Sequence, residues 1–279
     1  MSAAPSLETL LGAEPSRCCV SAYESEAVRW LLADELHPGG AALSRRLAHL
    51  AGIGPGSQVL DVASGRGRTA RLLASEFGAE VTGVEPSEPS VAAAQAEVEA
   101  AGLVGRVRFV RGDAAALPAA SRSVDAVMCE CAFCLFPGKQ RALAEMRRVL
   151  RPGGVVAIAD VTAEHDDLPA ALRGLVGRVA CLADALPSDG YEALLHDARF
   201  ELITAESHDG ALAALAERVE YRLRAARMLA TAAPYRDAVA EAIALVREAR
   251  SAIVRGSLGY QLFVARRTTS ASARGGHAR

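Results

Sequence analysis

An acidic side chain and a loop of small residues follow one another within residues 58–70. An apolar run reaches Asp61, the loop contains Gly65 and Gly67, and apolar residues at helical spacing come next. This order predicts a strand, a tight turn and a helix whose free N–H groups face the turn. Because glycine has no Cβ, the loop backbone can come close to a ligand. Asp61 would attract a cationic ligand and repel a pyrophosphate.

A dinucleotide-binding loop is the alternative interpretation of this stretch. Such a loop has the form G-x-G-x-x-G, and its third glycine packs the helix against the strand. Here Ala63, Gly65 and Gly67 occupy alternate positions, so that third glycine is missing. The loop alone therefore favours a cationic ligand but leaves other ligands of Rossmann-like folds open.

Further acidic side chains follow the next strands that the pattern predicts. Glu85 ends the second strand, Asp113 follows the third, and Glu130 follows the fourth. In an open parallel sheet, the carboxyl ends of the strands meet where ligands bind. A carboxylate at the second strand suits a ribose diol, because it can accept both hydroxyl hydrogens. Each acid alone is equally explained as a solvated strand end or a helix N-cap, but together they predict one site.

Alternating strand and helix patterns from residue 58 onward predict an α/β protein with a parallel sheet. The predicted strands are 58–62, 80–85, 107–111, 123–129, 155–161, 200–207 and 258–266. The predicted helices are 22–36, 41–51, 67–77, 88–101, 139–150, 168–186 and 190–198, with a stretch over 212–251 that breaks near Pro234. Within that stretch, Arg222, Arg224 and Arg227 are interpreted as a solvated helix face.

The expected domain organisation follows from these patterns. It comprises a flexible N-terminus (1–16), a helical cap (17–55), a Rossmann-like domain (56–208), a helical insertion (209–257), a last strand (258–267) and a disordered tail (268–279). The insertion could cover a substrate or simply add packing.

The composition excludes several classes of protein. With 279 residues, 51% of them hydrophobic, the chain can bury a sizeable core. A net charge of −2 gives no basic footprint for nucleic acid. No apolar run is long enough to span a bilayer, and no signal pattern begins the chain. We therefore expect a cytoplasmic protein without a membrane partner, in which the six cysteines stay reduced.

The stretch Val-Leu-Asp-Val-Ala-Ser-Gly-Arg-Gly and the turn Arg-Val-Leu-Arg-Pro-Gly-Gly at 148–154 resemble motifs of class I S-adenosylmethionine methyltransferases. The resemblance implies a Rossmann-like seven-stranded fold with an N-terminal helical cap and a helical insertion before the last strand. It implies S-adenosyl-L-methionine as cofactor and S-adenosyl-L-homocysteine as product. The implied cofactor residues are Asp61, Ala63, Ser64, Gly65, Gly67, Glu85, Pro86, Asp113, Ala114 and Cys129.

The cysteines form three clusters along the chain, and several interpretations compete for them. The clusters are Cys18-Cys19, then Cys129, Cys131 and Cys134 around the fourth strand's end, then Cys181. Free cysteine often only fills buried space. A zinc site is a second interpretation, although the C-x-C-x-x-C spacing lacks a second C-x-x-C. The third interpretation is a role in catalysis, beside the position expected for the transferable methyl group.

A narrower resemblance supports the catalytic interpretation. Cys131 stands eight residues before Lys139, as in arsenite S-adenosylmethionine methyltransferases, and the stretch from Cys181 followed by Tyr191-Glu192-Ala193-Leu194-Leu195 is similar to a second stretch of that family. The resemblance implies Cys131, Cys181 and Cys19 as ligands of a metalloid substrate, with Cys18 and Cys134 as further catalytic candidates. Cys134 departs from the family, which usually has asparagine there, and Cys129 is an addition.

Three functions therefore remain in view. The first is methyl transfer to a thiolate-bound trivalent metalloid, arsenite or methylarsenite, since soft thiolates select such centres. The second is methyl transfer to an O, N or C nucleophile of a small molecule, with Glu130 or His37 as base. The third is metalloid binding without turnover. The oligomeric state stays open.

Overall fold

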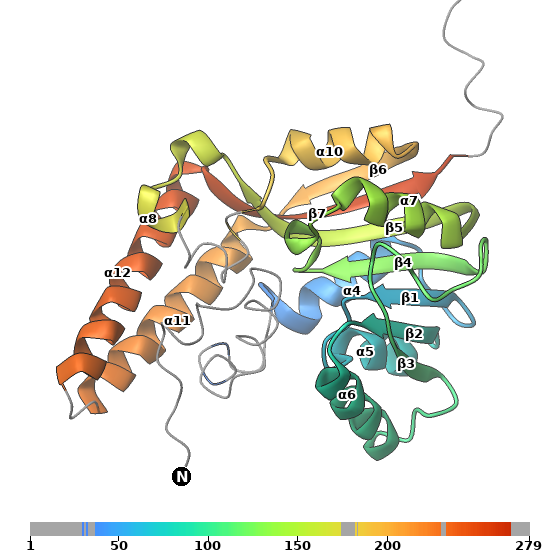
Figure 1. Cartoon of the computed structure of the whole chain (residues 1–279), viewed down its shortest axis with the longest axis horizontal. Helices are drawn as coiled ribbons and strands as arrows, with labels where there is room; N and C mark the ends of the chain where they lie inside the picture. The colour runs from blue at the N-terminus through green and yellow to red at the C-terminus, as the bar shows by residue number, and fades with distance from the viewer. Residues whose placement is uncertain are drawn as a thin grey trace, which may run out of the picture. The chain divides into compact units, whose positions relative to one another are not determined.

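A seven-stranded sheet with the order β3-β2-β1-β4-β5-β7-β6 organises the protein (Figure 1). The computed structural model describes Trp30, Leu32 and residues 37–173, 182, 184–229 and 233–268. The strands are β1 Gln58–Val62, β2 Glu80–Glu85, β3 Val107–Arg111, β4 Val124–Glu130, β5 Leu150–Ala163, β6 Phe200–Ser207 and β7 Leu258–Arg267. The predicted Rossmann-like seven-stranded fold is confirmed.

The strands that carry the predicted acids are parallel neighbours. β1 pairs with β2 on one side and with β4 on the other, and β2 pairs with β3, all in parallel. The strand order therefore reverses between β1 and β4. In open parallel sheets, ligands bind beyond the strand ends at such a reversal.

Helices connect these strands much as the sequence pattern predicts. They are α4 Gly40–Leu50, α5 Arg68–Glu76, α6 Glu88–Ala100, α7 Lys139–Val149, α8 Ala170–Arg173, α10 Ser188–Asp197, α11 Asp209–Leu229 and α12 Ala233–Arg255, with 3-10 turns at Phe133–Leu135 and His165–Asp167. The break near Pro234 is confirmed, because α12 begins at Ala233 and proline fits the first turn of a helix. Of the helix expected over 22–36, only Trp30 and Leu32 are described, both helical.

Two predicted boundaries are wrong. The helix expected over 168–186 is described only as α8, and residues 184–187 are not helical. Instead, Leu186 forms a parallel bridge to Thr162, and its carbonyl accepts a hydrogen bond from the amide of Ala163 at 2.9 Å. β5 begins at Leu150, five residues early, because Leu150 pairs with Val124 before a register shift.

The chain divides into two compact units. One contains Asp160–Ser188 and Ser207–Gln261, together with the residues up to Gly40. The other contains Ala41–Ala159, Asp189–Glu206 and the residues from Leu262 onward. The described residues expected to bind the cofactor all belong to this second unit. None of the helices in the described part of the chain is long and apolar enough to cross a membrane.

Helices α11 and α12 pack against one another in the first unit. Leu223, Val239 and Ile243 form a small buried cluster between them. Beside it, the buried carboxylate of Glu220 accepts hydrogen bonds from Arg224 at 2.6 Å, Arg247 at 2.9 Å and Arg250 at 2.5 Å. These arginines, Arg247 and Arg250 first, lower the pKa of Glu220 from 4.5 to about 2.

We expect the helical hairpin to lose stability as the pH falls from about 4.5 to 2. Because the pKa of Glu220 is lowered in the folded protein, its contribution is complete above its ordinary pKa and is lost as the folded carboxyl takes up a proton. Thermal melts followed by circular dichroism between pH 2 and 7 test this. The Glu220→Gln variant should melt lower at pH 7 and show a flatter pH profile. Glu248→Gln, at an exposed position on α12, should leave both features unchanged; equal profiles for the two variants would contradict the prediction.

Candidate cofactor site

The loop after β1 holds three residues in the left-handed backbone region. Ala63 has a φ of 59°, Gly65 of 52° and Gly67 of 71°. Glycine tolerates this region freely, whereas a residue with a Cβ loses roughly 1–2 kcal/mol. Ala63 therefore stands where the backbone favours glycine, in agreement with its place in the motif.

The two glycines of the loop have different surroundings. A Cβ on Gly67 would lie 2.1 Å from the ring of Phe109, and the same ring would lie 2.3 Å from a Cβ on Gly83. A Cβ on Gly65 would meet no atom within 4 Å. Gly67 and Gly83 thus let Phe109 pack between α5 and the sheet, while Gly65 borders open space that a ligand can enter.

Alanine at Gly67 should affect mainly folding, and alanine at Gly65 should affect mainly cofactor binding. Gly67→Ala should lower the free energy of unfolding by about 2–5 kcal/mol, because overpacking of the Phe109 ring adds to left-handed strain. Gly65→Ala should lower the free energy of unfolding only by the left-handed strain, about 1–2 kcal/mol. It should weaken cofactor binding at least about tenfold. Urea unfolding and calorimetric titration with the adenosyl cofactor measure the two effects. Similar stability losses in both variants would contradict this division of roles.

Asp61 is a buried carboxylate with one oxygen available to a ligand. Its side chain is 3% exposed, and its Oδ2 atom has no hydrogen-bond partner among the described residues. Burial first, and then the nearby carboxylates of Glu130 and Glu85, raise the pKa of Asp61 well above 3.8. The buried Ser64 Oγ likewise lacks a partner within the described part of the chain. Unsatisfied buried polar atoms are costly, so both atoms are suited to contact a bound molecule.

Glu85 is held at the end of β2 by backbone amides. Its Oε2 accepts from the Gly65 amide at 2.9 Å, and its Oε1 accepts from the Ser87 amide at 3.0 Å. The Ser87 hydroxyl in turn caps α6 by accepting from the Ser90 amide. The Glu85 carboxylate is thus positioned beside the glycine loop, as the ribose-binding interpretation requires.

Asp113 and Ala114 lie after β3 in a tight turn. The Asp113 side chain is exposed and accepts a hydrogen bond from the Ala115 amide at 2.7 Å. This turn leaves the acid at the same edge of the sheet as Asp61 and Glu85, since β3 runs parallel to β2. Its contact with an adenine amino group stays a prediction.

Glu130 joins three elements that the sequence does not show to be neighbours. Its carboxylate accepts from the Ser44 hydroxyl of α4 at 3.0 Å and from the Thr69 hydroxyl of α5 at 2.6 Å. Ser44 and Thr69 are both buried, and sequence reasoning missed them as part of the site. Thr69 could have been found from its place in the helical turn after the glycine loop, but Ser44 lies 86 residues from Glu130 and carries no such signal.

The three described cysteines differ in accessibility. Cys129 and Cys134 are fully buried, whereas Cys131 is partly exposed. Cys131 also has a φ of 53°, and its amide donates to the Ala159 carbonyl at 2.7 Å. Strained backbone of this kind at a non-glycine residue is frequent in active sites. Cys18, Cys19 and Cys181 lie outside the described residues, and no group of three or more metal-ligating side chains occurs in the described part of the chain.

Lys139 fixes the short helical turn that follows Cys131. Its ammonium donates to the carbonyl of Cys134 at 2.6 Å and to that of Phe136 at 3.3 Å. The ring of Phe133 packs against Tyr191 with centroids 5.9 Å apart. The lysine eight residues after Cys131 therefore positions the thiol segment through backbone contacts.

These residues fit the adenosyl cofactor that the motif resemblance implies. A cluster of carboxylates attracts a molecule that carries an amino group and a positively charged sulfur. The Asp61 Oδ2 and Ser64 Oγ atoms, which have no partner among the described residues, and the open space at Gly65 provide contacts and room for it.

Comparison with known proteins gives separate evidence on the family. A family model described as a methyltransferase domain matches residues 59–154. A demethylmenaquinone methyltransferase of Thermus thermophilus is 38% identical over 160 residues, which are 56% of this chain and 70% of that protein. An arsenite methyltransferase of Halobacterium salinarum is 39% identical over 158 residues, which are 55% of this chain and 39% of that protein. The chain spans 66%, 62% and 39% of the first three curated relatives that it matches.

Solved structures share the whole fold. The [4+2]-cyclase SpnF superposes with a TM-score of 0.73 at 24% identity, over 91% of this chain and 97% of that chain. At this identity the likeness shows the fold alone. Because that neighbour is described as a cyclase, the fold by itself does not determine the reaction.

Proposed function

The chain belongs to the class I S-adenosylmethionine-dependent methyltransferases, and we propose that it transfers the cofactor's methyl group to a thiolate-bound trivalent metalloid, arsenite or methylarsenite. The observation that carries the metalloid proposal is Cys131. It is partly exposed, lies directly after β4, and holds a left-handed backbone conformation beside the carboxylate cluster.

The chain's own residues would bind and orient the cofactor. Asp61 and Ser64 each offer an oxygen without a hydrogen-bond partner in the described part of the chain, and Glu85 offers a carboxylate already fixed by two amides. Bound there, the cofactor supplies an electrophilic methyl group on a positively charged sulfur. The buried carboxylates favour that charge before the reaction more than after it, so their main role is binding and orientation.

Cys131 would hold the acceptor. A trivalent metalloid bound by thiolates keeps a lone pair, and this lone pair is the nucleophile. The nucleophile carries no proton, so the proposal requires no general base. Soft thiolate ligands suit such a centre, and Cys181 and Cys19, both outside the described residues, are the proposed further ligands.

A small-molecule O-, N- or C-methyltransferase is the second candidate. It is favoured by the full burial of Cys129 and Cys134 and by the carboxylate of Glu130 next to Cys131. In that case the thiols line the site, and Glu130 is the candidate base.

Transfer of a labelled methyl group from the cofactor tests these candidates. The acceptors are arsenite, methylarsenite, other soft trivalent metalloids, and a set of phenols and amines. We expect labelled methylarsenicals, with loss of activity after thiol blocking. Label in a phenol or amine that survives thiol blocking would reject the metalloid in favour of the second candidate. Arsenite binding without adenosylhomocysteine formation would indicate a binding protein without turnover.

A further inference from the structure

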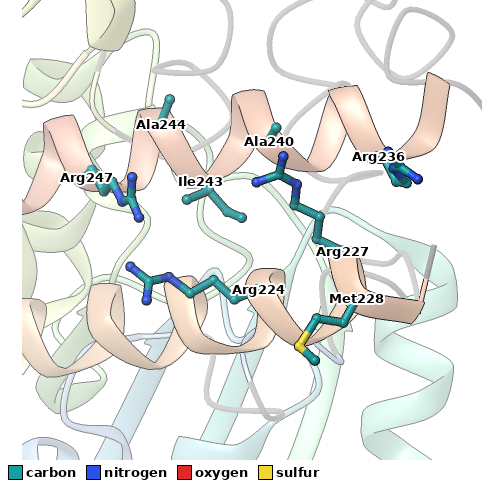
Figure 2. A pocket seen from close by; sticks show the side chains of 8 residues that line it. All are labelled: Arg224, Arg227, Met228, Arg236, Ala240, Ile243, Ala244 and Arg247. Atoms are coloured by element: carbon teal, nitrogen blue, oxygen red, sulfur yellow. The ribbon is translucent and has the colours of Figure 1, made fainter. Parts of the chain in front are cut away.

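The helical hairpin carries a cavity of about 610 Å³ whose lining includes none of the residues expected to bind the cofactor. Both helices contribute to it, as Figure 2 shows. We call it the hairpin pocket, and its lining residues are Arg224, Arg227, Met228, Arg236, Ala240, Ile243, Ala244 and Arg247. Ligand pockets in proteins commonly have volumes of about 300–1,000 Å³.

The side chains around this pocket carry an excess of positive charge. Arg224 and Arg247 lie at one end and share the Glu220 carboxylate with Arg250, so three guanidinium groups face one carboxylate. Arg227 and Arg236 lie at the other end, and neither forms a hydrogen bond or ion pair within the described part of the chain (Figure 2).

The acidic residues of α12 do not line the pocket. Asp237, Glu241 and Glu248 are absent from the lining, because the lining residues of α12 follow one face at helical spacing. Like charges that converge on a cavity repel one another. An anion bound between them would remove that repulsion.

The pocket also has an apolar part. Ile243, which is 5% exposed, lies between the two pairs of arginines, and Ala240 and Ala244 flank it on the same helix (Figure 2). The side chain of Met228 is 87% exposed at the rim. Such a surface suits the organic part of a ligand and would contribute nothing to binding of a small inorganic ion.

We propose that the hairpin pocket binds an organic phosphate, with the phosphate group held by the lining arginines and the organic group against Ile243 and its neighbours. The guanidinium group presents a planar fork of donors that matches phosphate oxygens in pairs. A phosphate ester carries up to two negative charges, so it compensates the excess of positive charge better than a carboxylate does. Arg224 and Arg227 are exposed on α11, as the interpretation of a solvated helix face requires, and the proposal adds a bound phosphate to that face.

Titration calorimetry on the full chain tests the proposal with four probes. The probes are n-octyl phosphate below its micelle concentration, inorganic phosphate, n-octanol, and vesicles of phosphatidylcholine with phosphatidate. We expect n-octyl phosphate to bind at least about tenfold more tightly than inorganic phosphate or octanol, and more weakly as salt increases. Equal affinity for inorganic phosphate, or binding to the vesicles alone, would overturn a pocket for a soluble organic phosphate.

A charge-matched pair of variants locates the site. The double variant Arg227→Gln with Arg236→Gln removes the two lining arginines that have no ion-pair partner among the described residues, and it should weaken n-octyl phosphate binding by about tenfold or more. The control, Arg173→Gln with Arg255→Gln, removes the same charge from exposed residues of α8 and α12 that do not line the pocket. Equal affinity in the two variants would overturn the proposal. The titration measures binding of n-octyl phosphate, so its outcome does not depend on whether the protein transfers a methyl group.

Discussion

Replacing Asp61 with asparagine should make the cofactor-free protein more stable while weakening cofactor binding about 100-fold or more. The side chain is 3% exposed and shares its surroundings with the carboxylates of Glu130 and Glu85. Asparagine has the same shape and can still accept the backbone hydrogen bond from Ala70. It removes a buried negative charge that a cationic ligand would compensate. Losing one member of a desolvated charge pair costs about 2–5 kcal/mol of binding.

The pH dependence follows from the raised pKa of Asp61. Since the folded protein holds this proton more tightly than the unfolded chain does, stability is complete at low pH and is lost as the pH rises through the raised pKa. The asparagine variant should lack this loss. Its melting temperature near neutral pH should therefore exceed that of the parent protein by about 2–4 °C for each kcal/mol gained. A cationic ligand favours the ionised carboxyl, so cofactor affinity of the parent protein should strengthen as the pH rises.

Thermal melts and calorimetric titration from pH 5 to 9 measure both effects. The control Glu99→Gln removes the same charge from an exposed position of α6, and it should change neither property. A variant at Asp61 that is less stable and still binds the cofactor normally would show that the carboxylate serves folding alone.

Replacing Cys131 with serine should lower metalloid methylation by about 1,000-fold or more, with cofactor affinity within about twofold of the parent. Serine offers a hard oxygen of similar size, which is a poor ligand for a soft trivalent centre. The backbone keeps its left-handed conformation and the amide keeps its bond to the Ala159 carbonyl. The substitution therefore removes the thiolate and changes little else in the structure.

The neighbouring thiol provides the matched comparison. Cys134 is fully buried in the 3-10 turn after β4, so Cys134→Ala should lower stability through lost packing and retain metalloid methylation. Labelled product formation and urea unfolding are measured on both variants. Full activity of Cys131→Ser would reject the thiolate role, while loss of activity in both variants with unchanged stability would extend it to Cys134.

Much of the cofactor site follows from linear pattern. Asp61, Gly65, Gly67, Glu85 and Asp113 stand at strand ends that parallel topology must bring to one edge of the sheet. The strand and helix pattern therefore predicts the fold, and the resemblance to class I methyltransferase motifs implies the cofactor. The C-terminal end of the helix expected over 168–186 was wrong, because apolar spacing does not reveal that Leu186 pairs with Thr162.

Contacts between distant segments could not be predicted from the sequence. Only packing shows that Gly67 makes room for Phe109 while Gly65 borders open space, because both glycines occupy equivalent places in the motif. Only the fold brings Ser44 and Thr69 to Glu130.

The sequence by itself determined the parallel sheet and the acids at its edge, because these depend on local periodicity and on short, regular connections. The family was implied by the resemblance of its motifs. The tertiary structure decided which of the three described thiols is accessible, and which buried carboxylate lacks a full set of partners among the described residues. It also decided that arginines of two helices converge on one pocket. Burial, electrostatic repulsion and cavities depend on contacts between side chains that are far apart in the sequence, and local sequence patterns do not predict such contacts.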